Sequence, residues 1–125
     1  MSQDEQDLVA LLAHFYLQNG RPAKAENLLT ALDIMVPDIP ATLAALAFAQ
    51  IRANHEELAL ETLDRLAMLG EIDTRFHLMR MQALSALNRT EEAEVAKANY
   101  LAMRNAPATE DRPGAIKGKP APARA

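Results

Sequence analysis

Residues 19–32 have the sequence Asn-Gly-Arg-Pro-Ala-Lys-Ala-Glu-Asn-Leu-Leu-Thr-Ala-Leu, which predicts the elbow of a helix hairpin. Gly20 tolerates the positive φ angle with which many helices end, and Pro22 fits the first turn of a following helix. Ala25 and Leu29 then continue at the spacing of one helix face. The stretch therefore predicts two helices joined by a sharp turn.

The elbow recurs along the chain. Ala25 is followed by Ala59 and Ala93 at equal intervals, and Asn54 and Asn88 precede the two later alanines as Gly20 precedes the first. The interval is about 34 residues, which is the period of the tetratricopeptide repeat (TPR), a helix-turn-helix unit that stacks into a solenoid. The sequence thus predicts an all-α fold, a short right-handed TPR solenoid of three hairpins and six helices.

The composition agrees with this class. Hydrophobic residues make up 50% of the 125 residues but aromatic residues only 4%, and the excess is Ala and Leu, which favours close-packed helices over a sheet. The chain contains no Cys, which excludes disulfides, thiolate zinc sites and thiol nucleophiles.

Helix boundaries follow from the prolines, glycines, asparagines and capping residues. We expect helices from 5 to 19, from Pro22 to Pro37, from Pro40 to Asn54, from Glu56 to Gly70, from Asp73 or Thr74 to Leu87, and from a Thr90 cap to Arg104. The repeats then cover about 6–39, 40–73 and 74–107 within a TPR domain at 5–104. Residues 105–125 hold four of the seven prolines and no large apolar residue except Ile116, so we expect a disordered tail.

The repeat pattern assigns packing roles to two sets of residues. Small residues allow the two helices of a hairpin to cross closely, and leucines fill the space between neighbouring hairpins. The small set is Ala13, Ala25, Ala47, Ala59 and Ala93, and the leucine set is Leu12, Leu29, Leu46 and Leu63. Arg80 and Lys97 occupy positions where buried residues are expected, so the third hairpin is either a solvent-facing end or out of register by one residue.

The first helix of each hairpin is expected to line the inner face of the stack. An apolar strip there would hold the helix or extended peptide of a partner. The candidate partner-binding residues are His14, Leu17, Phe48, Ile51, Arg52 and Leu78. The alternative for Phe48 and Ile51 is a place in the core, and the alternative for His14 is a partly exposed histidine with no special role.

The sequence offers no pattern of a catalytic, cofactor-binding or metal site. His14, His55 and His77 fall in different hairpins, and the four glycines are too dispersed for a phosphate-binding loop. Ser2 and Ser85 have no adjacent base in sequence. We therefore expect a protein that is not an enzyme and has neither cofactor nor small-molecule substrate.

Charge and hydropathy bear on partners and location. The net charge is -4, and the two acidic and four basic residues of 105–125 leave about -6 for the rest, which disfavours nucleic acid. The acidic N-terminus and the lack of a long apolar run predict a cytoplasmic protein without membrane insertion. The tail cations Lys117, Lys119 and Arg124 would contact an acidic partner or a membrane, or act only to solubilise the chain.

The segment 11–20, Leu-Leu-Ala-His-Phe-Tyr-Leu-Gln-Asn-Gly, carries a family resemblance together with the residues that follow it. These are Ala23, Ala25, Leu28, Leu29, Ala31, Leu32 and Pro37. The pattern resembles the small TPR chaperones of bacterial type III secretion systems, and is most similar to the YscY (SctY) group, over about residues 5–104. The tail and the degenerate third repeat depart from it. The resemblance implies a cytoplasmic chaperone that binds a small secreted protein of the SctX (YscX) type and docks with it on the export gate.

Two other functions are compatible with the same pattern. One is a chaperone for needle or translocator subunits of a secretion system. The other is a generic TPR adaptor that uses its convex face and its tail to join a larger assembly. Substitution of Leu17 or Phe48 by Glu should abolish partner binding by a chaperone and leave partner binding by an adaptor intact.

Overall fold

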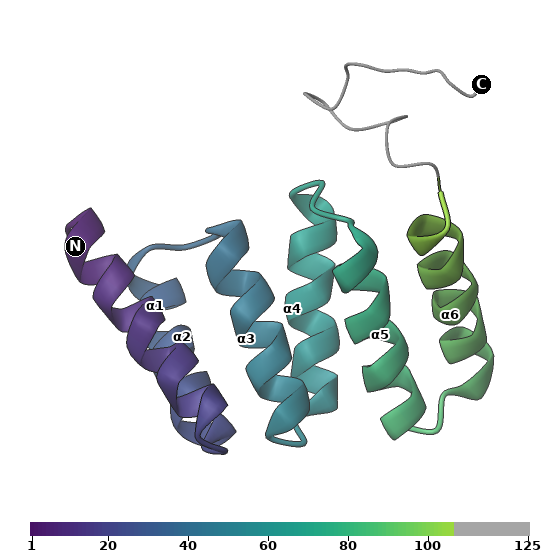
Figure 1. Ribbon diagram of the computed structural model, residues 1–125, viewed down its shortest axis with the longest axis horizontal. Helices are drawn as coiled ribbons and strands as arrows, with labels where there is room; N and C mark the ends of the chain where they lie inside the picture. The colour runs from purple at the N-terminus through teal and green to yellow at the C-terminus, as the bar shows by residue number, and fades with distance from the viewer. Residues whose placement is uncertain (107–125) are drawn as a thin grey trace.

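A computed structural model describes residues 1–106 of the chain, and these residues contain six helices and no strand (Figure 1). The helices are α1 (Gln3–Gln18), α2 (Pro22–Met35), α3 (Pro40–Arg52), α4 (Glu56–Met68), α5 (Thr74–Ala86) and α6 (Thr90–Arg104). The predicted all-α class with six helices is confirmed. All but the first two residues of the tail predicted at 105–125 lie outside the described residues.

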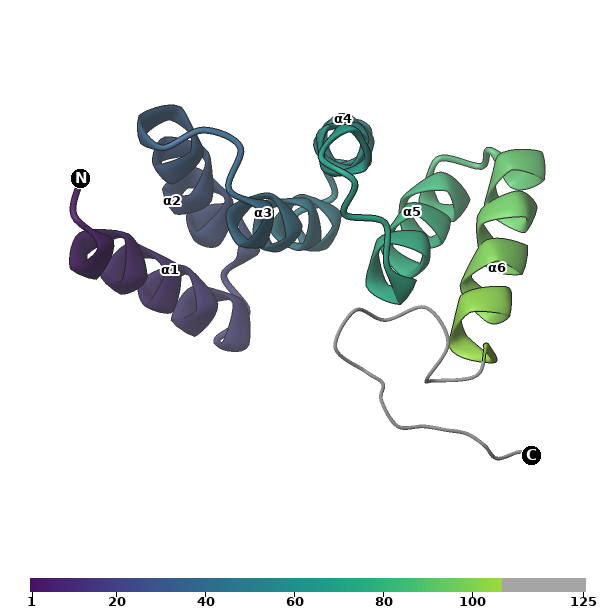
Figure 2. The same ribbon diagram turned by 90° about the horizontal axis from the view of Figure 1, so that it is seen from above.

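The helices form three hairpins, α1–α2, α3–α4 and α5–α6, that lie side by side in chain order (Figure 1). Their second helices begin at Pro22, Glu56 and Thr90, which are equally spaced along the sequence. The third hairpin therefore keeps the register of the other two. Seen from above, α1, α3 and α5 follow one another along one side of the stack, with α2 and α4 behind them (Figure 2).

The turn inside each hairpin explains why Gly and Asn recur there. The N–H of Gly20 donates to the carbonyl of Leu17 at 3.3 Å, and the N–H of Arg21 donates to that of Tyr16 at 2.8 Å. Both bonds recur at the equivalent residues of the other two hairpins. This pair of bonds needs a left-handed residue after the helix. Gly20, Asn54 and Asn88 supply it, with φ angles of 73°, 65° and 60°.

Side-chain caps start two of the six helices. Ser2 Oγ accepts from the N–H of Glu5, whose carboxylate accepts from the N–H of Ser2, and Asp73 Oδ1 accepts from the N–H of Phe76 at 2.8 Å. The prediction that Thr90 caps α6 is wrong. Thr90 is the first helical residue and the cap position belongs to Arg89, so the Thr90 side chain stands one residue too late to cap.

Two buried clusters hold the hairpins together. The first joins hairpins one and two and contains Ala13, Ala25, Leu29, Leu46 and Ala49. The second, between hairpins two and three, contains Leu43, Ala47, Leu60, Leu63, Leu66, Phe76, Met79, Ala83, Leu84, Ala93 and Ala96. The alanines predicted to allow close crossing are all buried, so the small-residue set is confirmed.

One member of the leucine set does not fill an inter-hairpin space. Leu12 is 40% exposed, whereas its equivalent in the second repeat, Leu46, is 4% exposed. The pattern identifies an inter-hairpin position, but within residues 1–106 no hairpin packs against that side of α1. At the other end of the stack Lys97 is exposed and Arg80 half-buried, so the third hairpin is the solvent-facing end.

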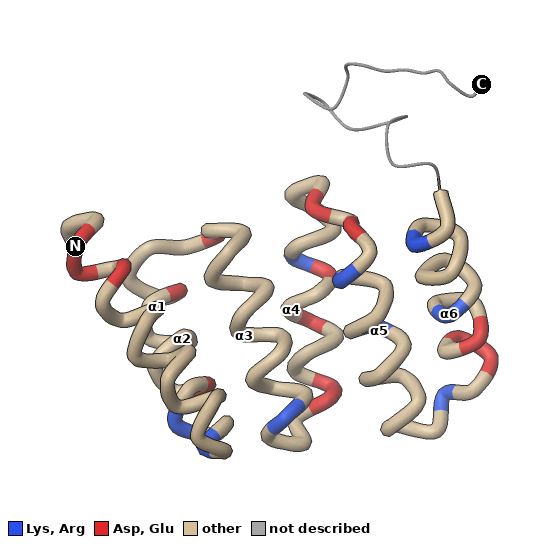
Figure 3. Tube along the Cα trace, viewed as in Figure 1, with Lys and Arg blue, Asp and Glu red and all other residues tan. Residues whose placement is uncertain are grey.

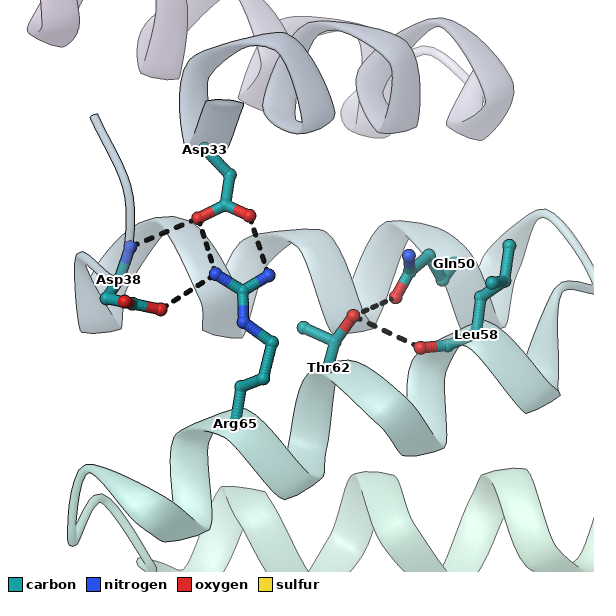
Figure 4. A network of polar contacts seen from close by, with 6 residues as sticks. All are labelled: Asp33, Asp38, Gln50, Leu58, Thr62 and Arg65. Atoms are coloured by element: carbon teal, nitrogen blue, oxygen red, sulfur yellow. Dashed lines mark hydrogen bonds and ion pairs between the residues drawn. The ribbon is translucent and has the colours of Figure 1, made fainter. Parts of the chain in front are cut away.

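Polar contacts between α2 and α4 add to the apolar packing. The guanidinium of Arg65 donates to Asp33 at 2.7 and 3.0 Å and to Asp38 at 2.8 Å (Figure 4). Thr62 Oγ1 donates to Gln50 Oε1 at 2.7 Å within hairpin two, where both side chains are buried. The Arg65 contacts connect hairpin two to hairpin one.

Candidate partner-binding groove

A groove of about 640 Å³ runs across the first helices of all three hairpins. Its lining residues are His14, Leu17, Gln18, Ala45, Phe48, Arg52, Arg75, Leu78, Met79 and Gln82. The structure thus brings together five of the six candidate residues from the sequence. That a partner binds there stays a prediction.

Helical spacing and the internal repeat together form this surface. His14, Phe48 and Gln82 are repeat equivalents, one from each of α1, α3 and α5, so the same face of each first helix lines the groove. Leu17 and Leu78 flank this row. A smaller cavity of about 100 Å³ between α1 and α3 adjoins the groove at His14, Leu17 and Ala45.

Ile51 is the candidate that lies apart from the groove. It is half-buried and packs against the cluster between hairpins two and three, which agrees with the alternative of a core role. Phe48 has both roles, because it packs against the same cluster and also lines the groove. The strip that a ligand can reach is therefore Leu17, Phe48 and Leu78.

The groove is basic although the protein is acidic. The guanidinium of Arg52 lies 5.7 Å from the centre of the Phe48 ring, in cation–π range. Neither Arg52 nor Arg75 forms an ion pair with any other residue of 1–106, and no Asp or Glu lines the groove. A desolvated ligand would thus meet two cations that lack internal partners. Arg75 is not among the candidate binding residues from the sequence.

Carboxylates appear only beyond one end of the groove. A neighbouring cavity of about 340 Å³ shares Arg75 and Met79 with the groove and adds Glu71 and Asp73, at the start of α5. Basic and acidic residues are otherwise both distributed along the stack (Figure 3). The basic character is therefore a local property of the groove.

The three histidines have unrelated surroundings. Gln18 Nε2 lies 3.1 Å from His14 Nε2 at the groove, and His55 Nδ1 lies 2.7 Å from Glu26 Oε1 of α2. His77 Nδ1 is buried without a hydrogen-bond partner in the described structure, and burial, helped by Arg80 and opposed by Asp73, lowers its pKa. No group of three potential metal ligands occurs within residues 1–106.

None of the helices between residues 1 and 106 combines the length and the apolar character needed to cross a bilayer. Comparison of the sequence with known proteins gives no relative: no family model matches it, and no curated protein does.

Proposed function

We propose that this protein is a type III secretion chaperone that holds a helical segment of a small secreted protein of the SctX (YscX) type in its groove. The complex would then dock on the export gate. The observation that carries the proposal is the apolar strip of Leu17, Phe48 and Leu78, which crosses three hairpins and has no covering element in residues 1–106. The sequence resemblance to the SctY group supplies the class of partner.

The groove suits an amphipathic helix for physical reasons. An apolar stripe on such a helix gains about 25 cal/mol for each Å² of apolar surface removed from water, and helix-in-groove recognition uses a row of anchors of this kind. Arg52 and Arg75 add a preference for carboxylates beside the apolar stripe of the ligand. A bound helix would bury these cations, and a buried cation needs a partner of opposite charge. A secreted protein with an aggregation-prone acidic helix would be kept soluble in this way.

The test is co-expression with a small secreted protein of the SctX type, followed by size-exclusion chromatography. We expect one complex, lost on Leu17→Glu or Phe48→Glu. Met68→Glu is the matched control, because Met68 is exposed and lies outside the groove on α4. Folding of each variant is checked by circular dichroism.

The outcome also separates the alternative functions. Capture of a needle or translocator subunit by the same groove would show that the proposed partner class is wrong. The groove would still be the binding site. A complex that survives both groove substitutions would instead indicate an adaptor that binds through another face, and the groove proposal would be abandoned.

A further inference from the structure

The outer side of α1 exposes four large apolar residues that the groove does not use. Leu8, Leu11, Leu12 and Phe15 follow helical spacing and are 65%, 64%, 40% and 56% exposed. We call them the α1 face. Leu8, Leu12 and Phe15 lie on a different side of the helix from His14 and Leu17, whereas Leu11 stands on the same side as Gln18 and borders the groove.

The equivalent residues of the other two hairpins indicate the packing role of the α1 face. The equivalents of Leu8, Leu12 and Phe15 in α3 are Thr42, Leu46 and Ala49, which are 7%, 4% and 0% exposed. In α5 the equivalents of Leu8, Leu11 and Phe15 are also buried; they are Phe76, Met79 and Ala83. Leu46 and Ala49 belong to the cluster shared with hairpin one, and Phe76, Met79 and Ala83 to the cluster shared with hairpin two. The α1 face is therefore an inter-helix packing surface that no helix of residues 1–106 covers.

End hairpins of soluble solenoids normally replace such a surface with polar residues. The third hairpin follows this rule at one position, since Leu29 and Leu63 are buried whereas their equivalent Lys97 in α6 is exposed; Leu101, one turn further along α6, is 37% exposed. The first hairpin does the reverse, since it presents three leucines and a phenylalanine. A contiguous exposed apolar patch of this type marks an association surface.

We propose that the α1 face joins two copies of this chain in a two-fold symmetric dimer, with the two α1 helices antiparallel. A head-to-tail contact would place this face against hairpin three and bury the charge of the exposed Lys97, although Leu101 beside it is apolar. A two-fold contact uses the same patch twice, so one exposed patch is sufficient and the assembly closes. The proposal is independent of the function proposed for the groove.

Charge complementarity favours this occupant and orientation. The charged residues of α1 are Asp4, Glu5 and Asp7, all near its start, and the helix contains no Lys or Arg (Figure 3). The elbow after α1 carries the exposed cations Arg21 and Lys24. Antiparallel pairing centred near Leu11 and Leu12 brings the acidic start of each α1 toward the basic elbow of its partner, and also opposes the two helix dipoles.

The test measures the mass of the full-length chain by analytical ultracentrifugation, up to about 0.1 mM protein, where a micromolar dimer is fully populated. We expect twice the 13.7 kDa of one chain. Leu11→Glu and Phe15→Glu should each raise the dissociation constant about tenfold or more. Met68→Glu, at another exposed position, should leave the mass unchanged.

A charge exchange tests the orientation. The pair Arg21→Glu and Lys24→Glu should weaken the dimer, and addition of Asp4→Lys and Asp7→Lys should restore it. The proposal is overturned by a monomer at every concentration, by a dimer that Leu11→Glu and Phe15→Glu leave intact, or by a mass that keeps growing past two chains. Failure of the charge exchange to restore the dimer would overturn the antiparallel arrangement.

Discussion

Arg65 of α4 and Asp33 of α2 form two hydrogen bonds, 2.7 and 3.0 Å long, that join the second helices of hairpins one and two. The Asp33 side chain is 12% exposed and the Arg65 side chain 40%. Asp33 also accepts from the N–H of Asp38 at 3.2 Å, which ties the loop before α3 to the same carboxylate. The hairpins are thus fixed by a directional contact as well as by apolar packing.

Arg65→Met should lower the free energy of unfolding by about 1–2 kcal/mol, because it leaves the Asp33 carboxylate in a largely buried place without its cation. The partial exposure of Arg65 keeps the effect below that of a fully buried pair. Urea unfolding monitored by circular dichroism measures it. Asp33→Asn should cost less, since the Arg65 side chain can reach water, and equal losses in the two variants would contradict this account.

Acid should weaken the same contact. The hydrogen bonds from Arg65 hold the pKa of Asp33 below its ordinary value of 3.8, so the folded chain keeps the carboxylate charged where the unfolded chain protonates it. This contribution is complete well above pH 3.8 and is lost as the pH falls through the folded pKa. We expect the acid decline in stability to be shallower in Asp33→Asn than in the wild type; parallel curves would show that the contact does not contribute.

His77 should make the stability of the fold depend on pH in a second, higher pH range. Burial lowers its pKa below 6.5 in the folded chain, so the unfolded chain binds more protons between that lowered pKa and 6.5. Stability is then greatest above pH 6.5 and falls as the pH drops through this interval. Thermal unfolding from about pH 7 to about pH 5 should show the fall in the wild type and a smaller one in His77→Gln. An unchanged slope in the variant would assign the effect to other groups.

Ala25→Leu should destabilise the protein by about 1–3 kcal/mol, because Ala25 is fully buried and a larger side chain separates α2 from the helices packed on it. Ala31→Leu is the matched control, since Ala31 lies on the exposed side of the same helix. Chemical denaturation of both variants gives the comparison. Similar stability of the two would mean that close helix crossing is not needed at residue 25.

Arg52→Glu combined with Arg75→Glu should weaken binding of an acidic helical partner at least about tenfold and remove most of its salt dependence. Calorimetric titration at low and high salt measures both quantities. Arg104→Glu reverses an exposed charge on α6, outside the groove, and serves as the control. Equal weakening by the control would indicate a general charge effect rather than recognition in the groove.

The hairpins were predictable because the residues that determine each turn and helix start are close together in the sequence. A left-handed Gly or Asn, a helix start shortly after it and a buried Ala recur in every repeat, and each signal acts within one turn of chain. The capping box of Ser2 and Glu5 was equally visible as Ser-x-x-Glu, although it was not predicted. The inner face followed from the same period, which is why five candidates line one groove.

What the sequence did not show depends on neighbours in space. Arg65 and Asp33 are far apart in the sequence, and only the stacked hairpins bring them together. Leu12 is exposed because no other hairpin of residues 1–106 packs on that side of α1, a property of position in the stack and not of residue type. The sequence left the place of Ile51 open between groove and core, and only the stacked hairpins show that it packs against the cluster with hairpin three.

Because the hairpins are arranged in a line, hairpin two is the one hairpin of residues 1–106 with a packed neighbour on each side, and the outer hairpins can open separately. Backbone amides of α3 and α4 should then exchange with solvent more slowly than those of α1, α2, α5 and α6. A ligand that touches α1, α3 and α5 together would connect the two ends, and turn separate local opening events into one cooperative unfolding transition.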